Sequence, residues 1–268
     1  MLTISAAEVD QALTFPGLVE TLRTAFRDGA VQPVRHHHTV DRPDGAASTL
    51  LLMPAWTDFN APGASAGGHI GVKIVTVSPD NNAIGKPAVM GLYLLLDGTT
   101  GEPEALIDGQ RLTQWRTACA SALAASYLAR KDASRLLVVG AGALSTFLAK
   151  AHSAVRPIKS IRIWNRTPVN AEKVAAGLRA EGLPASVDMR ARVYVDTRSG
   201  ATKEAGDIVQ PLASGVLKPD AIIADLHELA RGEKAGRQGD GEITLFKSVG
   251  AALEDLAAGI AVYKALKR

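Results

Sequence analysis

The sequence has only one cysteine, Cys119, and few aromatic residues. A single cysteine excludes an intramolecular disulfide and is typical of a reducing compartment, so we expect a cytoplasmic location. Phe, Trp and Tyr make up 4% of the residues, and the Lys and Arg residues are dispersed among acids. This pattern argues against a nucleic-acid-binding surface, which usually shows clustered basic residues.

Long apolar runs and familiar catalytic motifs are also missing. No run reaches the length that crosses a membrane, and the first ten residues lack the basic and apolar regions of a signal peptide. There is no G-x-S-x-G elbow and no Cys–His arrangement for nucleophilic catalysis. The run His36–His38 has no cysteine or HExxH-type partner, and neighbouring residues of a strand face opposite ways, so we predict no metal site.

What is present is the composition of an ordinary globular protein, with 47% apolar and 21% charged residues and a net charge of +3. The 268 residues are enough for one large or two modest domains. Residues 5–29 are predicted to form two short helices, with Ser5 as the cap of the first and Pro16 near the start of the second. Short β-rich runs separated by turn formers follow over residues 34–107.

From Gly109 the pattern is helical as far as Arg130, and it then alternates between strands and helices. The strand "RLLVVG" is followed by a helix from near Ala143, the strand "SIRIWN" and a helix over about 168–181. This alternation predicts an α/β fold with a Rossmann-type dinucleotide-binding domain over 113–249. Residues 1–112 together with a C-terminal helix over 250–268 are predicted to form a separate α+β domain.

The glycine-rich turn in "SRLLVVGAGALSTF" carries the cofactor prediction. Gly140 permits a tight turn, and Gly142 and Ala143 let the backbone approach a pyrophosphate at a helix N-terminus. The third small position is Ser145, which packing between helix and strand tolerates. The second strand ends in Asn165, Arg166 and Thr167 instead of the acid typical of NAD sites. Because Arg166 can pair with a 2′-phosphate, we predict NADPH over NADH; the alternative is an arginine on a solvated loop.

Three basic residues stand among apolar ones. Arg116 shares a helical face with leucines, Lys73 lies in the apolar strand "HIGVKIVTV", and Arg35 precedes the first strand. An arginine in an apolar stripe needs an anionic partner, which can be a structural carboxylate or that of a substrate. Taken singly, each of the three is better explained by a structural salt bridge or a snorkelling side chain.

Together these blocks resemble the ornithine cyclodeaminase/μ-crystallin family. The similar segments are "HIGVKIVTV", "GLYLLLDGTTGEPEALIDGQRLTQWRTACASALAASYLAR", "LLVVGAG", "IRIWNRT" and "LFKSVGAALEDLAA". The resemblance implies a homodimer whose first domain pairs with its twin and supplies the substrate pocket. It also implies that Arg35, Lys73 and Arg116 bind the substrate carboxylate. The segment Ser248, Val249 and Gly250 matches one near the nicotinamide.

The resemblance also narrows the activity. Reductases of this family carry "PDMRE" or "PDWRE" where cyclodeaminases carry a "GGDCPGK"-like segment, and "DMR" at 188–190 looks like the reductase version. We therefore expect an NADPH-dependent ketimine reductase that converts pyrroline-2-carboxylate or piperideine-2-carboxylate to L-proline or L-pipecolate. Lys73 and Arg116 are its expected catalytic residues. The alternatives are ornithine cyclodeaminase or alanine dehydrogenase activity with NAD, and a non-catalytic, crystallin-like NADPH-binding protein.

One connection between two predicted strands is too short for a parallel crossover. Between the strand-like runs at 183–187 and 191–197 only three residues intervene, whereas a parallel crossover needs about a dozen or more. The family has a further helix, strand and loop here. We therefore predict that the sequence omits residues of the real polypeptide. The omitted residues are expected to be mobile loops on both sides of "DMR". A genuine deletion from the polypeptide would instead remove residues that line the cofactor-binding site. Wide Cα spacings at 187–188 or 190–191 would support omission.

Overall fold

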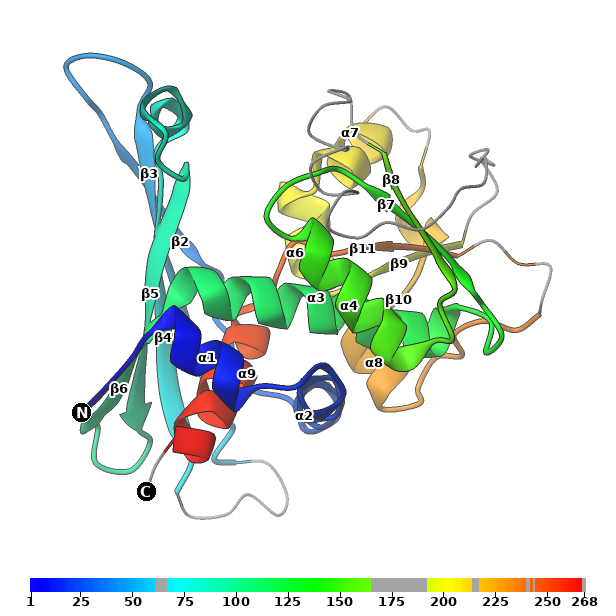
Figure 1. The fold of residues 1–268 in the computed structure, drawn as a ribbon, viewed down its shortest axis with the longest axis horizontal. Helices are drawn as coiled ribbons and strands as arrows, with labels where there is room; N and C mark the ends of the chain where they lie inside the picture. Colours follow the sequence, from blue (N-terminus) through cyan, green and yellow to red (C-terminus); the bar gives the residue numbers. More distant parts are fainter. Residues whose placement is uncertain (61–66, 165–191, 214–216, 240–241, 243, 267–268) are drawn as a thin grey trace. The chain divides into compact units, whose positions relative to one another are not determined.

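The structure is a computed structural model that describes residues 1–60, 67–164, 192–213, 217–239, 242 and 244–266 (Figure 1). The chain divides into two compact units, of which the first comprises Met1–Thr14, Asp28–Arg116 and Ala252–Arg268, and the second Phe15–Arg27 and Thr117–Ala251. Their limits lie near the predicted ones, except that residues 15–27 group with the second unit. The assignment of 1–112 with 250–268 and of 113–249 as two domains stays a prediction.

The first unit contains most of the β structure. Its strands are β1 (Leu2–Ile4), β2 (His36–Val40), β3 (Ser48–Trp56), β4 (His69–Val77), β5 (Val89–Asp97) and β6 (Pro103–Asp108). Its helical elements are α1 (Ala6–Ala12), the 3-10 helix η1 (Pro79–Ile84), α9 (Ala252–Leu266) and the start of α3 (Gly109–Leu128). As predicted, Ser5 caps α1: its Oγ accepts a hydrogen bond from the Glu8 backbone N–H at 3.4 Å, and the Ser5 N–H donates to Glu8 Oε2 at 2.8 Å.

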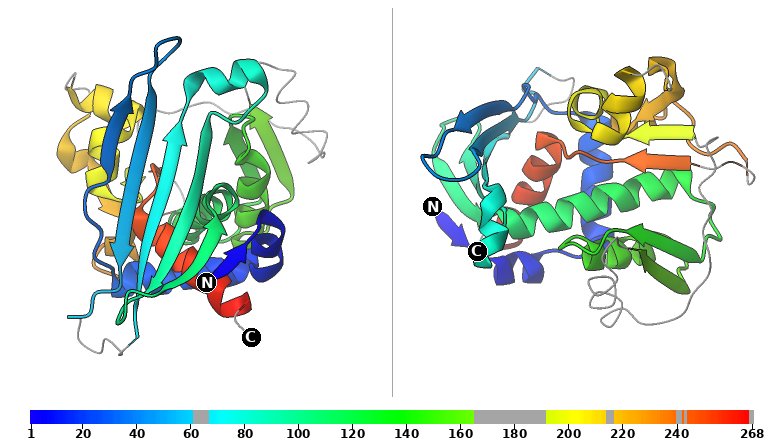
Figure 2. Two further views of the ribbon diagram at one scale, coloured as in Figure 1. Left: turned by 90° about the vertical axis from the view of Figure 1, so that its left-hand side faces the viewer. Right: turned by 90° about the horizontal axis from the view of Figure 1, so that it is seen from above.

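The six strands form one sheet in the order β1-β6-β5-β4-β3-β2. All neighbours are antiparallel except β1 and β6, which pair in parallel. Helices α1 and α9 lie on one face of this sheet (Figure 1), whereas the left panel of Figure 2 shows no described α-helix over the opposite face. Alternation along β4 buries Gly71, Lys73 and Val75 on the helix-covered face, as the sequence pattern predicts.

Tyr93 of β5 is the largest buried side chain on this inner face. It lies opposite Lys73 in the β4–β5 ladder and is fully buried. The ring occupies space left by two glycines: a Cβ at Gly71 would collide with the Tyr93 hydroxyl, and a Cβ at Gly259 of α9 would lie 2.6 Å from Tyr93 Cε1. The absence of these two side chains therefore lets α9 pack closely on the sheet.

The second unit contains α2 (Phe15–Asp28) and the rest of α3. Its strands are β7 (Arg135–Val139), β8 (Ser160–Trp164), β9 (Arg192–Val195), β10 (Ile222–Asp225) and β11 (Thr244–Lys247). Its remaining helices are α4 (Ser145–Val155), α6 (Arg198–Glu204), α7 (Gly206–Ala213), η2 (Pro219–Ala221) and α8 (Leu226–Ala230). Pro16 is the second residue of α2, as expected, and α4 begins two residues after the predicted Ala143.

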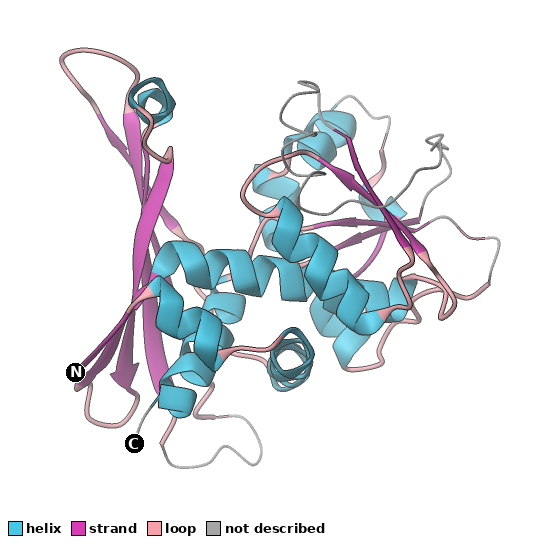
Figure 3. Cartoon of the chain, in the orientation of Figure 1, coloured by secondary structure: helices cyan, strands magenta, loops and turns pink. Residues whose placement is uncertain are grey.

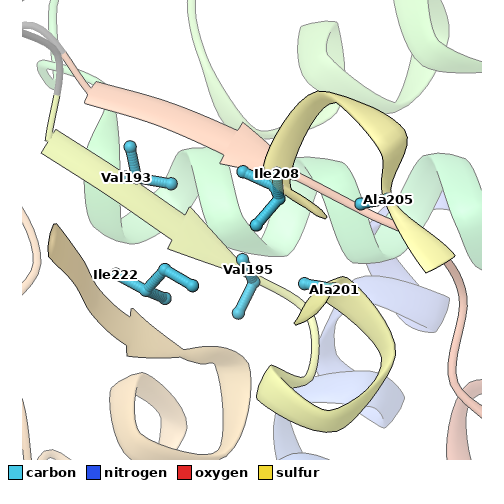
Figure 4. Packing of buried hydrophobic residues seen from close by; sticks show 6 residues of the cluster. All are labelled: Val193, Val195, Ala201, Ala205, Ile208 and Ile222. Carbon is cyan, nitrogen blue, oxygen red and sulfur yellow. The ribbon is translucent and has the colours of Figure 1, made fainter. Parts of the chain in front are cut away.

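All strand pairs of the second unit are parallel, which is typical of a Rossmann-type fold. Among the described residues they form two sheets, β7-β8 and β10-β9-β11. Figure 3 colours these strands magenta. An apolar cluster packs helices α6 and α7 against β9 and β10 (Figure 4), and it consists of Val193, Val195, Ala201, Ala205, Ile208 and Ile222. The α/β class and the Rossmann-type character are thus confirmed. No helix in the described parts of the chain is long and apolar enough to span a membrane.

We expect Gly259→Ala to destabilise the protein. Helix propensity alone would favour alanine by about 1 kcal/mol, but the new Cβ meets a fully buried ring that has no room to move. Overpacking of this kind costs about 1–3 kcal/mol, measurable as a lower free energy of unfolding in denaturant titrations. Gly239→Ala is the control, because none of the described residues has an atom within 4 Å of its added Cβ. Equal stability of Gly259→Ala and the parent would show that the Tyr93 packing is wrong.

Candidate active site

Two of the three predicted cations meet two carboxylates in the first unit. The Nζ of Lys73 lies 3.1 and 3.3 Å from the two carboxylate oxygens of Asp255. Arg116 donates from Nη1 to Glu254 Oε2 at 2.6 Å and from Nε to Asp255 Oδ1 at 3.1 Å. The four side chains, here called the charge cluster, are at most 5% exposed. The two positive and two negative charges therefore neutralise one another in a site that is shielded from water.

Each member of the charge cluster is placed by its element. The pleat of β4 turns Lys73 toward the covered face of the sheet, and Arg116 lies in the second turn of α3. Glu254 and Asp255 stand in the first turn of α9, where the helix dipole favours negative charge. Because Asp255 contacts both cations, it links β4, α3 and α9 through one carboxylate.

Burial and neighbouring charges shift the pKa values of Lys73 and of Tyr93. Burial lowers the pKa of Lys73 from its usual 10.5 to about 8; the negative charge of Asp255 raises it and Arg116 lowers it further. Burial, together with the negative charge of Asp255, raises the pKa of Tyr93 well above its usual range. Lys73 is therefore mostly protonated at neutral pH, yet close enough to its pKa to exchange a proton.

The structure brings Lys73 and Arg116 together through a structural carboxylate, one of the two partners that the sequence left open for Arg116. Arg35 is half-buried and directly precedes the first β2–β3 pair, His36 with Leu52. Continuing that register by one residue places Arg35 beside Met53, whose partner in β4 is Lys73. The pairing of Arg35 with a substrate stays a prediction.

Glu254 and Asp255 were missed from the sequence, although a signal existed. Two adjacent acids interrupt the apolar segment "VGAALEDLAAGIAV", and an acid in a helix that is apolar all round needs a buried cation. Which cations they meet depends on contacts across 138 to 182 residues of sequence, which periodicity does not reveal.

The glycine turn of the second unit has the geometry that a pyrophosphate requires. Gly140 has φ +113°, a conformation for which glycine is needed, and within the described parts of the chain no atom lies within 4 Å of a Cβ built on Gly142. Ser145 is buried and its Oγ donates to the carbonyl oxygens of Gly140 at 3.1 Å and Gly142 at 2.9 Å. Ser145 therefore stabilises the turn through two hydrogen bonds that a third glycine could not make. No side chain caps the start of α4, and Ala143 is exposed in the turn.

A third buried carboxylate, also missed from the sequence, organises the predicted nicotinamide segment. Asp196 at the end of β9 is fully buried. Its Oδ2 accepts hydrogen bonds from Ser248 Oγ at 3.1 Å and from the backbone N–H groups of Val249 and Gly250 at 2.7 and 2.6 Å. Its Oδ1 accepts one from the Thr197 N–H at 2.7 Å. Asp196 thus holds the segment 248–250 in one conformation.

Several predicted features lie outside the described residues. These are the cofactor-discriminating residues Asn165, Arg166 and Thr167, the segment 188–190, and the Cα spacings around 187–191. Their roles, and the predicted omission of residues around "DMR", are therefore not tested by the geometry.

Comparison with known proteins finds relatives along the whole chain. An uncharacterized protein of Schizosaccharomyces pombe is 34% identical and is aligned over 97% of this chain and 96% of its own length. A Delta(1)-pyrroline-2-carboxylate reductase of Colwellia psychrerythraea is 31% identical over 99% of both chains. The solved structure of the Thermococcus litoralis Delta(1)-pyrroline-2-carboxylate reductase with NADH and L-proline superposes with a TM-score of 0.86 at 28% identity, covering 99% of this chain and 97% of that one.

These relatives are longer inside the aligned region. The match to the S. pombe protein spans 326 aligned positions, and 97% of 268 residues is about 260, which leaves about 66 positions without a residue of this chain. The match to the C. psychrerythraea reductase spans 324 positions and 99% of the chain, which leaves about 59. The chain therefore lacks roughly sixty residues that these two relatives contain.

We expect Asp255→Asn to destabilise the first unit strongly. The substitution keeps the size of the side chain but leaves two buried cations facing one buried carboxylate. Removing one partner of a buried ion pair costs about 3–5 kcal/mol of unfolding free energy. Glu20→Gln, which removes the exposed partner of Arg23, is the matched control and should change stability little. An Asp255→Asn protein as stable as the parent would contradict the charge cluster.

The family itself is established by a sequence model. The model of the ornithine cyclodeaminase/mu-crystallin family matches residues 2–188 and, in a second stretch, residues 180–268. The two matched stretches overlap at residues 180–188, so the residues that the relatives have in addition belong between β8 and β9. This is the place where three residues separate two predicted strands. The chain belongs to the ornithine cyclodeaminase/mu-crystallin family.

Proposed function

We propose that this protein reduces the C=N bond of a cyclic imino acid, pyrroline-2-carboxylate or piperideine-2-carboxylate, to L-proline or L-pipecolate. The observation that carries the proposal is the pair of buried cations, Lys73 and Arg116, held beside each other in a chain that aligns end to end with a named pyrroline-2-carboxylate reductase. The T. litoralis reductase, solved with L-proline, adds support from a related fold.

The chain's own residues suit this reaction. The substrate has one carboxylate, which Arg35 and Arg116 bind and orient, because a guanidinium can donate two parallel hydrogen bonds to a carboxylate. Reduction of the imine adds a proton to nitrogen, and Lys73, with its pKa lowered to about 8, supplies it. Asp255 keeps the Lys73 ammonium in place.

A nicotinamide dinucleotide supplies the hydride that adds to the imine carbon. The positive φ of Gly140, the open space at Gly142 and the uncapped start of α4 fit its pyrophosphate. Ser248, Val249 and Gly250 are the proposed nicotinamide neighbours. We propose NADPH over NADH on the strength of Asn165-Arg166-Thr167 alone, since the T. litoralis reductase was solved with NADH.

One alternative has an observation in its favour. The roughly sixty residues missing relative to the relatives fall within the dinucleotide-binding unit, which favours a protein that binds ligand without turnover. Ornithine cyclodeaminase or NAD-dependent alanine dehydrogenase activity is distinguished by ammonia release from ornithine and by oxidation of alanine.

We further propose a cytoplasmic homodimer with a role in proline metabolism. The outer face of the six-stranded sheet carries exposed apolar residues in register, including Ile74 opposite Leu92, and Met90 two pairs further along, opposite Thr76. An apolar face of this kind is usually covered by a partner, and a second copy offers the same face.

The test of the reaction is oxidation of NADPH by the protein with five- and six-membered cyclic imino acids. We expect turnover with at least one ring size and at least tenfold better efficiency with NADPH than with NADH. Losing one charge-assisted contact to the 2′-phosphate costs about 1.5–3 kcal/mol, which is tenfold or more. Arg166→Ala should remove the preference, whereas Arg130→Ala should keep it. No turnover with either ring would reject the reductase; equal use of both cofactors would reject the NADPH assignment.

The pH profile tests the role of Lys73. A proton donor acts in its protonated form, so kcat/KM should fall as the pH rises through about 8. Lys73→Ala should lose most turnover while cofactor binding, measured by fluorescence titration, stays largely intact. Lys131→Met changes an exposed lysine and should leave the profile unaltered. A parent profile that is flat from pH 7 to 10, or near-normal turnover of Lys73→Ala, would exclude Lys73 as the donor.

Light scattering coupled to size exclusion tests the dimer. We expect the parent to elute as a dimer and Leu92→Glu to be monomeric, because the substitution buries a charge in the proposed interface. Ile84→Glu introduces the same charge at an exposed residue of η1, which belongs to none of the strands, and should remain dimeric. A monomeric parent, or a dimeric Leu92→Glu, would show that the outer face is not the interface.

A further inference from the structure

We propose that Glu254 occupies the place of the substrate carboxylate on Arg116 while the site is empty, and turns back to the start of its own helix when the substrate binds. This role rests on the proposed binding of a carboxylate by Arg116, and it gives a function to an acid that the reaction itself does not use. Three features support it: the donors of Arg116, the two acids that contact them, and the position of Glu254 in α9.

Both edges through which Arg116 can bind a carboxylate are partly taken. A carboxylate accepts two parallel N–H groups from a guanidinium, either Nε with Nη2 or Nη1 with Nη2. Glu254 accepts from Nη1 at 2.6 Å, and Asp255 accepts from Nε at 3.1 Å. The Arg116 side chain is 5% exposed, and the two acids are fully buried. A ligand carboxylate therefore binds in the bidentate manner only where one of these acids gives up its place.

Glu254 is the acid whose departure disturbs the charge cluster less. Asp255 contacts Lys73 at 3.1 and 3.3 Å as well as Arg116, so its departure would withdraw a negative charge from two buried cations. A glutamate has one more rotatable bond than an aspartate, so its carboxylate can move further while the helix stays in place. The incoming carboxylate gives Arg116 the same negative charge that Glu254 takes away.

Helix α9 offers the Glu254 carboxylate a second place. Glu254 is the third residue of α9, the position from which a glutamate reaches back to the backbone N–H at the helix start. Two other helices of this chain use that contact. Glu8 of α1 accepts from the Ser5 N–H at 2.8 Å, and Glu228 of α8 accepts from the Asp225 N–H at 2.9 Å. The partial positive charge of the helix N-terminus stabilises a carboxylate there.

The two places of Glu254 have effects of opposite sign on stability and on binding. In the empty protein Glu254 supplies a negative charge to a buried guanidinium, and loss of such a partner is strongly destabilising. The same contact weakens the binding of any carboxylate, because the ligand has to displace it. Removal of the charge of Glu254 should therefore lower the stability of the protein and raise its affinity for carboxylates.

The experiment titrates the full 268-residue protein with pyrrole-2-carboxylate, a five-membered ring that has a carboxylate and no C=N bond to reduce. Isothermal titration calorimetry gives the dissociation constant. We expect Glu254→Gln to bind this probe at least tenfold more tightly than the parent, because a neutral amide competes less well for Arg116 than a carboxylate does. The variant should also unfold at a lower denaturant concentration. Glu8→Gln makes the same change at the same position of α1 and should leave the affinity unaltered.

A crystal structure of the parent with the probe decides the matter if Glu254→Gln fails to fold. We expect the probe carboxylate on Nη1 of Arg116 and the Glu254 carboxylate on a backbone N–H at the start of α9. Glu254 still in contact with Nη1 while the probe is bound would overturn the proposal. Equal or weaker binding by a folded Glu254→Gln protein, or no binding of the probe at all, would overturn it as well.

The outcome is separable from that of the proposed reaction, because the probe is not reduced. A protein that turns over no cyclic imino acid, but whose Glu254 leaves Arg116 when the probe binds, would reject the reductase and retain the displacement. A protein that turns over an imino acid while Glu254 stays on Nη1 beside the bound probe would retain the reductase and reject the displacement.

Discussion

The buried charge cluster is the interaction on which the first unit depends. Four ionised side chains without access to water are stable only if every charge is paired, because the cost of burying an unpaired ion exceeds what packing returns. Asp255 is the member that satisfies two cations at once, and it thereby links α9 to both β4 and α3. The same contact presents Lys73 and Arg116 as a fixed pair, so the stability of the sheet–helix packing and the geometry of the proposed carboxylate site have one origin.

Local patterns predicted much of the fold. Alternation along β4 predicted the buried face that carries Lys73, Ser5 was predicted as the cap of α1, and "GAGALS" predicted the turn before α4. The choice of Ser145 is explained by its two hydrogen bonds to the turn, which spacing alone did not suggest. These features were accessible because each depends on residues within one turn or one strand.

The remainder depends on contacts between distant segments. The partners of Lys73 and Arg116, and the hydrogen bonds of Asp196 to residues 248–250, join elements that only the folded chain brings together. The division of the described strands of the second unit between two sheets was not expected from the βαβα pattern, which predicts parallel strands but not how they group. The length of the relatives agrees with the short spacing between 187 and 191, because the residues that they have in addition belong between β8 and β9.

The crystal structure of the protein with L-proline bound tests the central claim most directly. The account predicts a product carboxylate within hydrogen-bonding distance of Arg116, with the Lys73 ammonium beside the ring nitrogen and still in contact with Asp255. Proline bound elsewhere, while Lys73 and Arg116 contact only Glu254 and Asp255 and remain closed to ligand, would contradict it. The charge cluster would then be a purely structural salt-bridge network.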